Sequence, residues 1–146
     1  NFKGIPSFSP EHFRYVNNAD PLKAKQLFKG LDQLMDEGVA QLFTLDINGR
    51  KVVGTVGALQ FEVIQYRLEH EYGAKCSYEN LHVHKACWVE PENPKSEEFK
   101  DFKRVKQRYL AKDKQGQLVF LADSAFTIQM TQQKYPTVKL HFTSEF

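Results

Sequence analysis

The stretch that decides the fold is Val39 to Ala58, "VAQLFTLDINGRKVVGTVGA". Apolar residues recur on both sides of Asn48-Gly49, a dipeptide that suits turns whose central residues need positive φ. The stretch therefore predicts a β-hairpin. Because segments of helical periodicity lie before and after it, the hairpin is the centre of a longer pattern of helices and strands.

The helix before the hairpin is predicted from Asp20 to Gly38. Asp20 suits the N-cap, Pro21 the first helical position and Gly38 the C-terminal end. Apolar residues fall on one face of this helix at Ala24, Leu27, Phe28, Leu31, Leu34 and Met35. The helix after the hairpin is predicted over residues 58–72, with Gly73 behind it and with Phe61, Ile64, Leu68 and Tyr72 on its buried side. Gly30 is expected to let the first helix pack closely on a sheet.

Strands are predicted on the outer sides of the two helices. "HFRYVN", residues 12–17, alternates in character, and residues 74–90, "AKCSYENLHVHKACWVE", read as one or two strands. The resulting order, β-α-β-β-α-β, is typical of the split βαβ or ferredoxin-like plait. We therefore expect an α+β fold, with an antiparallel sheet and helices on one face, over about residues 10–90.

The remainder of the chain predicts a C-terminal α/β extension over about residues 91–146. After "PENPK" we expect a helix over residues 97–109, a strand in "GQLVFLA", a helix over residues 124–134 and a strand in "TVKLHF". No sequence repeat is visible. We expect the extension to pack on the plait, so that residues 1–146 form a single domain.

Composition sets limits on the class of protein. The chain has 146 residues, which suits one ordinary domain, and 41% apolar with 26% charged residues is typical of a globular protein. No apolar run is long enough to span a membrane, and the N-terminus does not resemble a signal peptide. Two cysteines favour a reduced, cytoplasmic setting with no membrane partner. Because the chain starts at Asn1 and not at Met, we expect it to be a piece of a longer protein.

Gly54 and Gly57 lie between the hairpin and the second helix, where phosphate-binding loops also place glycines. A P-loop needs Gly-Lys-Ser or Gly-Lys-Thr, which the sequence lacks, and a dinucleotide fingerprint needs a third glycine and a parallel sheet. We therefore expect the two glycines to be structural, letting a strand turn tightly into a helix. No catalytic or cofactor-binding residue is predicted.

Three alternatives remain open at this point. Acylphosphatases share the plait and a glycine-bearing loop, but they hold phosphate with an arginine after an aromatic residue, where this chain has Glu62 after Phe61. A generic RNA-binding plait would expose aromatic residues on its sheet, with Phe43, Tyr78 and Trp88 as candidates. A zinc site would draw on Cys76, His82, His84 and Cys87, but their spacing matches no standard pattern, so no metal is predicted.

Charge gathers in residues 100–114, which hold seven basic and two acidic residues. The local net charge is therefore +5, against +2 for the chain. The basic residues, our candidate contacts to RNA, are Lys100, Lys103, Arg104, Lys106, Arg108, Lys112 and Lys114. Lys100, Arg104 and Arg108 recur at helical spacing, and such a face can bind phosphates by releasing counterions. An ordinary solvated face is the competing interpretation.

Two long stretches of the sequence carry a family resemblance. "FSPEHFRYVNNADPLKAKQLFKGLDQLMDEGVAQLF" and "VVGTVGALQFEVIQYRLEHEYG", together with the later "WVE", resemble the C-terminal domain of the bacterial class II peptide chain release factors, release factor three. The resemblance runs from about Phe8 to the end and is densest through Tyr72. "GALQFE", residues 57–62, is also similar to a strand-to-helix turn in the third domain of elongation factor G.

The resemblance implies that the full protein is a translational GTPase that promotes departure of class I release factors from the ribosome. GTP and Mg²⁺ would bind in an N-terminal G domain, followed by a β-barrel domain, and neither domain is in this sequence. The chain would then be a non-catalytic module without a cofactor of its own. Its implied partners are the ribosome, through ribosomal RNA or protein, and the G and β-barrel domains of the same protein.

Overall fold

The structure is a computed structural model that describes residues 8–146. Its first half contains four strands, β1 (His12–Asn18), β2 (Gln41–Leu45), β3 (Lys51–Thr55) and β4 (Cys76–Asn80). A short 3₁₀ helix, η1 (Pro21–Lys23), precedes α1 (Ala24–Asp36), and α2 (Gln60–Tyr72) follows the hairpin. The strands pair in the antiparallel order β4-β1-β3-β2. This arrangement confirms the predicted α+β class and ferredoxin-like plait.

The second half repeats that arrangement. Its strands are β5 (Lys85–Pro91), β6 (Leu110–Lys112), β7 (Leu118–Ala122) and β8 (Val138–His141), and its helices are α3 (Glu97–Val105), η2 (Gln107–Tyr109) and α4 (Ala125–Lys134). The chain order is again β-α-β-β-α-β, and the strands pair in the order β8-β5-β7-β6. The predicted α/β extension is therefore a second plait. A repeat that the sequence does not show is present in the structure.

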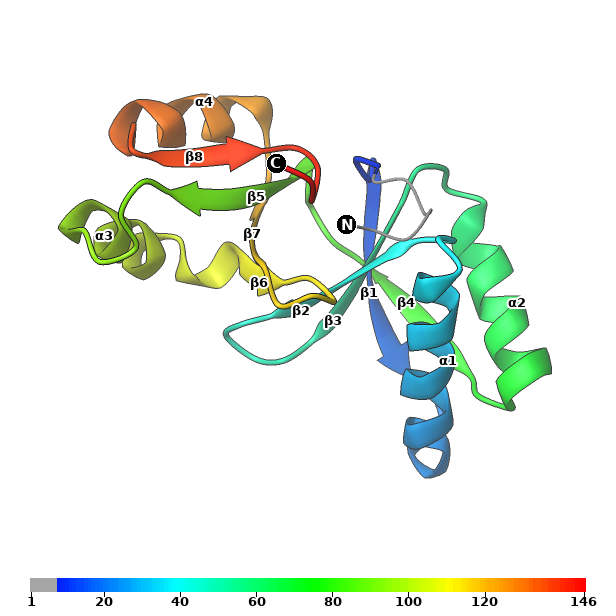
Figure 1. Cartoon of the computed structure of the whole chain (residues 1–146). Coiled ribbons are helices and arrows are strands. Elements are labelled where there is room, and N and C mark those ends of the chain that lie inside the picture. Colours follow the sequence, from blue (N-terminus) through cyan, green and yellow to red (C-terminus); the bar gives the residue numbers. More distant parts are fainter. Residues whose placement is uncertain (1–7) are drawn as a thin grey trace.

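The two halves share one continuous sheet of eight strands. Its order is β4-β1-β3-β2-β6-β7-β5-β8. Counted within each half, the strands run fourth, first, third, second from either edge of the sheet towards the centre, so the sheet is symmetric. The halves join through β2 and β6, where Thr44 pairs with Lys112 and Leu45 with Ala111. Figure 1 shows the strands of the second half running across those of the first, so the sheet bends sharply at this junction.

Three apolar cores separate the layers. One lies between the first half-sheet and α1 with α2, and includes Leu31 and Phe61. Another lies between the second half-sheet and α3 with α4, and includes Phe102. The third joins the other faces of both half-sheets, bringing Phe43 of β2 against Trp88 of β5 with ring centroids 5.8 Å apart. Each half thus carries its helices on one face, as predicted, and the other half covers its second face.

The helix ends follow the sequence signals closely. Asp20 accepts a hydrogen bond from the backbone N–H of Leu22 at 3.1 Å, and Gly38 and Gly73 take the positive φ expected behind a helix. Ser96 and Ser124 cap α3 and α4. The helix predicted over residues 97–109 instead ends at Val105 and continues as η2. Among residues 8–146, no helix has the length and apolar character needed to cross a bilayer.

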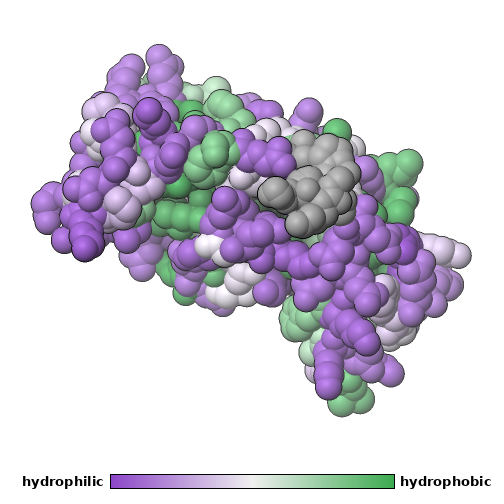
Figure 2. Space-filling view, in the orientation of Figure 1, coloured by the Kyte–Doolittle hydropathy of each residue, from purple (hydrophilic) through white to green (hydrophobic). Residues whose placement is uncertain are grey.

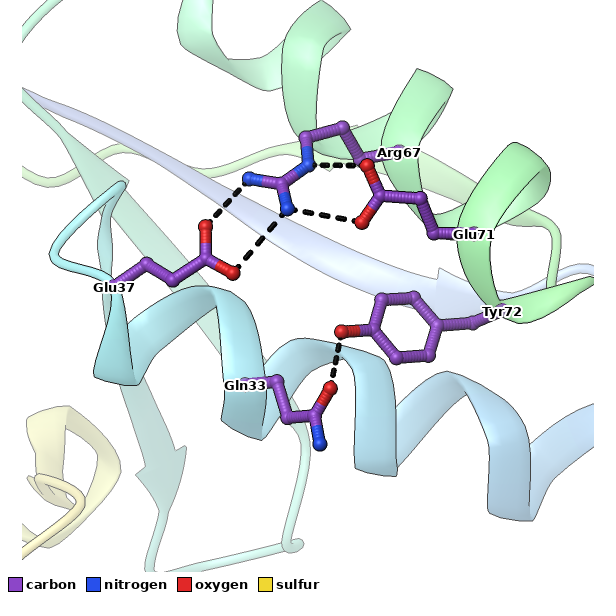
Figure 3. A network of polar contacts seen from close by, with 5 residues as sticks. All are labelled: Gln33, Glu37, Arg67, Glu71 and Tyr72. Carbon is purple, nitrogen blue, oxygen red and sulfur yellow. Dashed lines mark hydrogen bonds and ion pairs between the residues drawn. The ribbon is translucent and has the colours of Figure 1, made fainter.

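The two helices of the first half pack directly against each other. A Cβ added at Gly30 would lie 2.7 Å from Leu68 Cδ2 and 2.9 Å from the Tyr72 ring. The close packing predicted for Gly30 is therefore against α2 and not against the sheet, which corrects that expectation. Beside this contact, the Arg67 guanidinium of α2 binds the carboxylates of Glu37 and Glu71 (Figure 3).

Candidate functional site

The turn between β3 and α2 satisfies its own backbone. The backbone N–H of Gly57 donates to Oε1 of Gln60 at 2.8 Å, and the Thr55 hydroxyl donates to the Gly57 carbonyl at 2.8 Å. A phosphate loop would need such N–H groups free to face the anion. Glu62 adds a carboxylate in the first turn of α2. The geometry therefore supports the structural interpretation of this turn and argues against both a phosphate loop and an acylphosphatase-like site.

Gly54 and Gly57 have different surroundings. Gly57 lies in the turn itself with negative φ, and a Cβ there would meet only Gln60 Oε1, at 3.7 Å. Gly54 lies one step earlier, inside β3, where it pairs with Phe13 of β1. A Cβ at Gly54 would come within 2.9 Å of Pro10 Cβ. Only Gly57 is part of the predicted turn. Gly54 lies in β3, where the absence of a side chain lets Pro10 and the Phe13 ring pack against its backbone.

An arginine that the sequence analysis did not single out lies near the start of α2. The guanidinium of Arg14, on β1, lies 4.5 Å from the centroid of the Phe61 ring and 6.0 Å from that of Tyr78. This is cation–π geometry, in which the ring faces attract the charge. No local motif marks Arg14, because Tyr78 reaches it through the pairing of β1 with β4 and Phe61 through the packing of α2 on the sheet.

The aromatic residues proposed for an RNA-binding sheet face do not form an exposed platform: two are fully buried, and Tyr78 is half-buried on the helix side. Phe43 and Trp88 are fully buried in the core between the half-sheets. Tyr78 packs on the opposite side of its sheet, near α2, and its hydroxyl donates to the Phe61 carbonyl at 2.7 Å. Because the second half covers the sheet face, the prediction of a generic RNA-binding plait is wrong.

The four residues considered for zinc do not form a cluster. Cys76 and Cys87 lie in different cores, and burial raises the pKa of the Cys87 thiol to about 12. His82 and His84 lie in the connection between β4 and β5, and not on a strand as expected. Within the described part of the chain, no three His, Cys, Asp or Glu side chains gather closely enough to hold a metal ion.

The basic stretch is divided by the fold. Lys100, Lys103 and Arg104 lie on α3, whereas Arg108 lies in η2, beyond the end of the α-helix. The helical spacing predicted to include Arg108 therefore stops at Arg104. Lys106 caps the end of α3, and Lys112 and Lys114 lie in β6 and in the turn that follows it.

The α3 cations face solvent with weak local partners. Lys100 forms an exposed ion pair with Glu97 at 3.4 Å, and Arg104 pairs with Asp101 one turn away. Exposed pairs of this kind contribute little to stability, so both cations stay available to an external anion. Lys103 lies over the Phe99 ring at 4.7 Å from its centroid. Figure 2 shows the hydrophilic surface over this end of the molecule, at the left.

Lys112 and Lys114 bind the first half instead. Lys112 Nζ lies 3.1 Å from both carboxylate oxygens of Asp46, and Lys114 pairs with Asp36 at the end of α1. Lys114 Nζ also donates to the Asp32 carbonyl at 3.2 Å. These contacts hold the two halves together across β2 and β6. The contiguous cationic surface is therefore restricted to α3 and η2.

These observations define a class of protein: an α+β domain built as two ferredoxin-like halves, with an exposed cationic helix. Comparison with known families then identifies the group within that class. The chain belongs to the family described as class II release factor RF3, C-terminal domain, whose model matches residues 2–132. The match confirms the resemblance drawn from the sequence; it spans the first half of the fold and the second half as far as α4. The chain is thus a release factor C-terminal domain, from a family involved in translation termination.

Proposed function

We propose that this domain is the ribosome-facing and interdomain module of a cytoplasmic GTPase that promotes departure of class I release factors from the ribosome. The observation that carries the proposal is the family match over residues 2–132. In this proposal GTP and Mg²⁺ bind to a G domain outside the chain, and the domain contributes geometry and surface. Accordingly, the 146-residue chain alone hydrolyses no GTP, and the full-length protein does.

The cationic surface of α3 and η2 is the part that we expect to meet the ribosome. Side chains of Lys100 and Arg104 are 60% and 73% exposed, and Lys103, Lys106 and Arg108 lie beside them along the same segment. Lysine and arginine on a rigid element bind ribosomal RNA phosphates by releasing counterions, and they also pair with acidic ribosomal proteins. Lys112 and Lys114 do not belong to this surface because they lie in β6 and the turn after it, where they contact Asp46 and Asp36 of the first half.

Charge reversal in the full-length protein tests this surface. Lys100, Arg104 and Arg108 are changed to Glu together, and ribosome affinity is measured over a range of salt concentrations. Each lost phosphate contact flattens the slope of log affinity against log salt by about one unit. A control with the same charge change carries Glu at Lys25, Lys29 and Lys75, which are exposed on the first half. Equal slopes for the α3 variant and wild type would contradict the proposed ribosome contact.

The outer side of α2 is the surface that we assign to the other domains of the protein. Leu59, Val63 and Tyr66 follow one another at helical spacing and are 68%, 43% and 63% exposed. Figure 2 shows apolar surface at the right, where α2 begins in Figure 1. A row of exposed apolar side chains marks an interaction surface. Leu59→Asp should therefore loosen the full-length protein, seen as faster limited proteolysis between domains, while the unfolding midpoint of the 146-residue chain stays unchanged.

A further inference from the structure

A groove separates the C-terminal ends of α3 and α4. It is lined by Val105, Lys106, Met130, Thr131, Lys134 and Tyr135. The equivalent helices of the first half, α1 and α2, close directly on each other around Gly30. The two helices of the first half therefore pack against each other. The two helices of the second half are separated by a groove that no side chain of residues 8–146 fills.

The walls of the groove are apolar and exposed. Val105 of α3 and Met130 of α4 are 43% and 46% exposed. α3 buries Phe99 and Phe102, whereas Thr131 is the only fully buried residue of α4. Phe126, one turn before Met130 on α4, is 67% exposed, and Tyr109 of η2 is 45% exposed. Methionine adapts its shape to different apolar partners. These walls fit an apolar side chain entering from outside the domain.

Thr131 supplies an unsatisfied hydrogen-bonding group at the groove. Its side chain is 2% exposed, and its hydroxyl oxygen has no hydrogen-bond partner among the described residues. The large majority of buried hydroxyl groups in proteins are paired, so each unpaired one calls for an explanation. The orphan hydroxyl is a second observation, independent of the apolar walls, that points to a ligand.

The charge around the groove is positive. Lys106 and Lys134 line it, and within residues 8–146 neither forms an ion pair. Each instead lies near a ring, with Lys106 Nζ 5.5 Å from the centroid of Phe120. The nearby carboxylate of Asp101 is already bound by Arg104 and by the Tyr135 hydroxyl. Lys134 lies near enough to that carboxylate to contribute, after Tyr135 and Arg104, to the lowering of its pKa, but it forms no ion pair with it, so both lysines can meet a carboxylate of the ligand.

We propose that this groove binds a short amphipathic segment of a protein partner, which places an apolar side chain between α3 and α4 and carboxylates beside Lys106 and Lys134. Apolar anchors on one face of a helix commonly dock in grooves of this kind. A protein segment fits better than RNA because phosphates would use the lysines but leave Val105 and Met130 without a partner. The inference does not depend on whether α3 meets ribosomal RNA.

A library of random short peptides displayed on phage, selected on the 146-residue chain, is the probe. We expect the selected peptides to combine apolar residues with Asp or Glu. Fluorescence anisotropy with the most enriched peptide should then show that Met130→Glu and Lys134→Glu each weaken binding by about tenfold or more, as for central interface residues. Matched controls, Leu22→Glu and Lys139→Glu, place an acidic residue at exposed positions outside both proposed surfaces and should alter affinity less than about twofold.

Thr131→Val separates binding from folding. The variant keeps the shape of the side chain and removes the orphan hydroxyl, so it should weaken peptide binding without lowering the unfolding midpoint. The proposal is overturned if the selection yields no peptides that combine acidic and apolar residues. It is also overturned if Met130→Glu and Lys134→Glu bind the enriched peptide as tightly as wild type. It is also wrong if labelled oligouridylate binds the groove, losing affinity in Met130→Glu and Lys134→Glu, while no peptide is selected.

Discussion

Two glycines three residues apart show how position decides the role of a residue. Gly57 has room for a Cβ, which would make only an ordinary contact with Gln60 Oε1, and its backbone N–H donates to the same oxygen. Gly54 has ordinary strand geometry, but Pro10 and Phe13 lie so close that a methyl group has no room. The two glycines of the motif are therefore constrained for different reasons: Gly57 by the turn, and Gly54 by the close approach of Pro10 and Phe13.

Gly54→Ala and Gly57→Ala form a matched pair of variants. We expect Gly54→Ala to lower the free energy of unfolding by about 1–3 kcal/mol, because the new methyl group must displace Pro10 or Phe13. Gly57→Ala should change it by less than about 0.5 kcal/mol, because its Cβ would make only ordinary contacts. Urea unfolding followed by circular dichroism measures both. Equal effects from the two substitutions would contradict these assignments.

At the residue scale, sequence reasoning found the cations but not their partners. Lys112 is 66 residues from Asp46 in the sequence, and the residues around neither of them indicate that the two side chains meet. The same holds for Arg14 over Phe61, which depends on how β1 lies in the sheet. Helix caps such as Asp20 and Ser124 were predictable because their hydrogen bonds stay within a few residues.

The elements of the first half were predictable because each is long and periodic enough to be recognised. The second plait was missed mainly because of β6, which has only three residues, Leu110–Lys112. A strand that short shows no alternation, and the helical spacing of residues 97–109 runs directly into it. The open edge strand β4 is also poorly marked, since Cys76 is its only buried residue. Without β6, the last third of the chain reads as an extension and not as a repeat.

One interaction between elements makes a pH-dependent contribution to stability. The Tyr135 hydroxyl, at the end of α4, donates to Asp101 Oδ2 of α3 at 2.7 Å. This bond, together with Arg104, lowers the pKa of Asp101 below its ordinary 3.8. Burial and the same bond raise the pKa of Tyr135 to about 12. The Asp101 contribution is present above pH 3.8 and is lost as pH falls through the lowered pKa. The Tyr135 contribution is present below pH 10 and is lost as pH rises towards 12.

Tyr135→Phe should therefore lower the urea midpoint by a constant amount between about pH 5 and pH 9. The difference from wild type should narrow in acid, as Asp101 takes up a proton, and again above pH 10, as Tyr135 loses one. Tyr66→Phe, on the exposed side of α2, is the control and should show no such dependence. A wild-type advantage that stayed constant down to pH 2 would show that the bond to Asp101 does not carry the effect.

At the scale of the whole molecule, the repeat explains why the sheet face is closed. A single plait leaves one side of its sheet bare, and the apolar residues on that side then need a partner. Here the partner is the other plait, with the β2–β6 junction allowing the sheet to bend until the two faces meet. The helices lie outside, so the helical surfaces available to other molecules are those of α1 and α2 on one half and of α3 and α4 on the other (Figure 1).

This shared core predicts that the halves unfold together. Trp88, the only tryptophan of the chain, is fully buried between them, and its indole N–H donates to Asp113 at 2.9 Å. Its fluorescence reports on the interface between the halves, whereas far-ultraviolet circular dichroism reports on all the helices. If the core between the half-sheets stabilises both, the two signals should change over the same range of urea concentrations, as in a two-state transition.

Phe43→Ala tests the same coupling from the other half. Phe43 is fully buried and touches both Phe13 of its own half and Trp88 of the other. Its truncation should lower the free energy of unfolding by about 3–5 kcal/mol and shift both signals by the same amount. Phe126→Ala, which removes an exposed ring, should shift neither by much. Two results would mean that each plait is stable without the other. In one, the tryptophan fluorescence changes at lower urea concentration than the helical signal; in the other, the helical signal has two steps and Phe43→Ala shifts only one of them. The single domain expected for residues 1–146 would then be two.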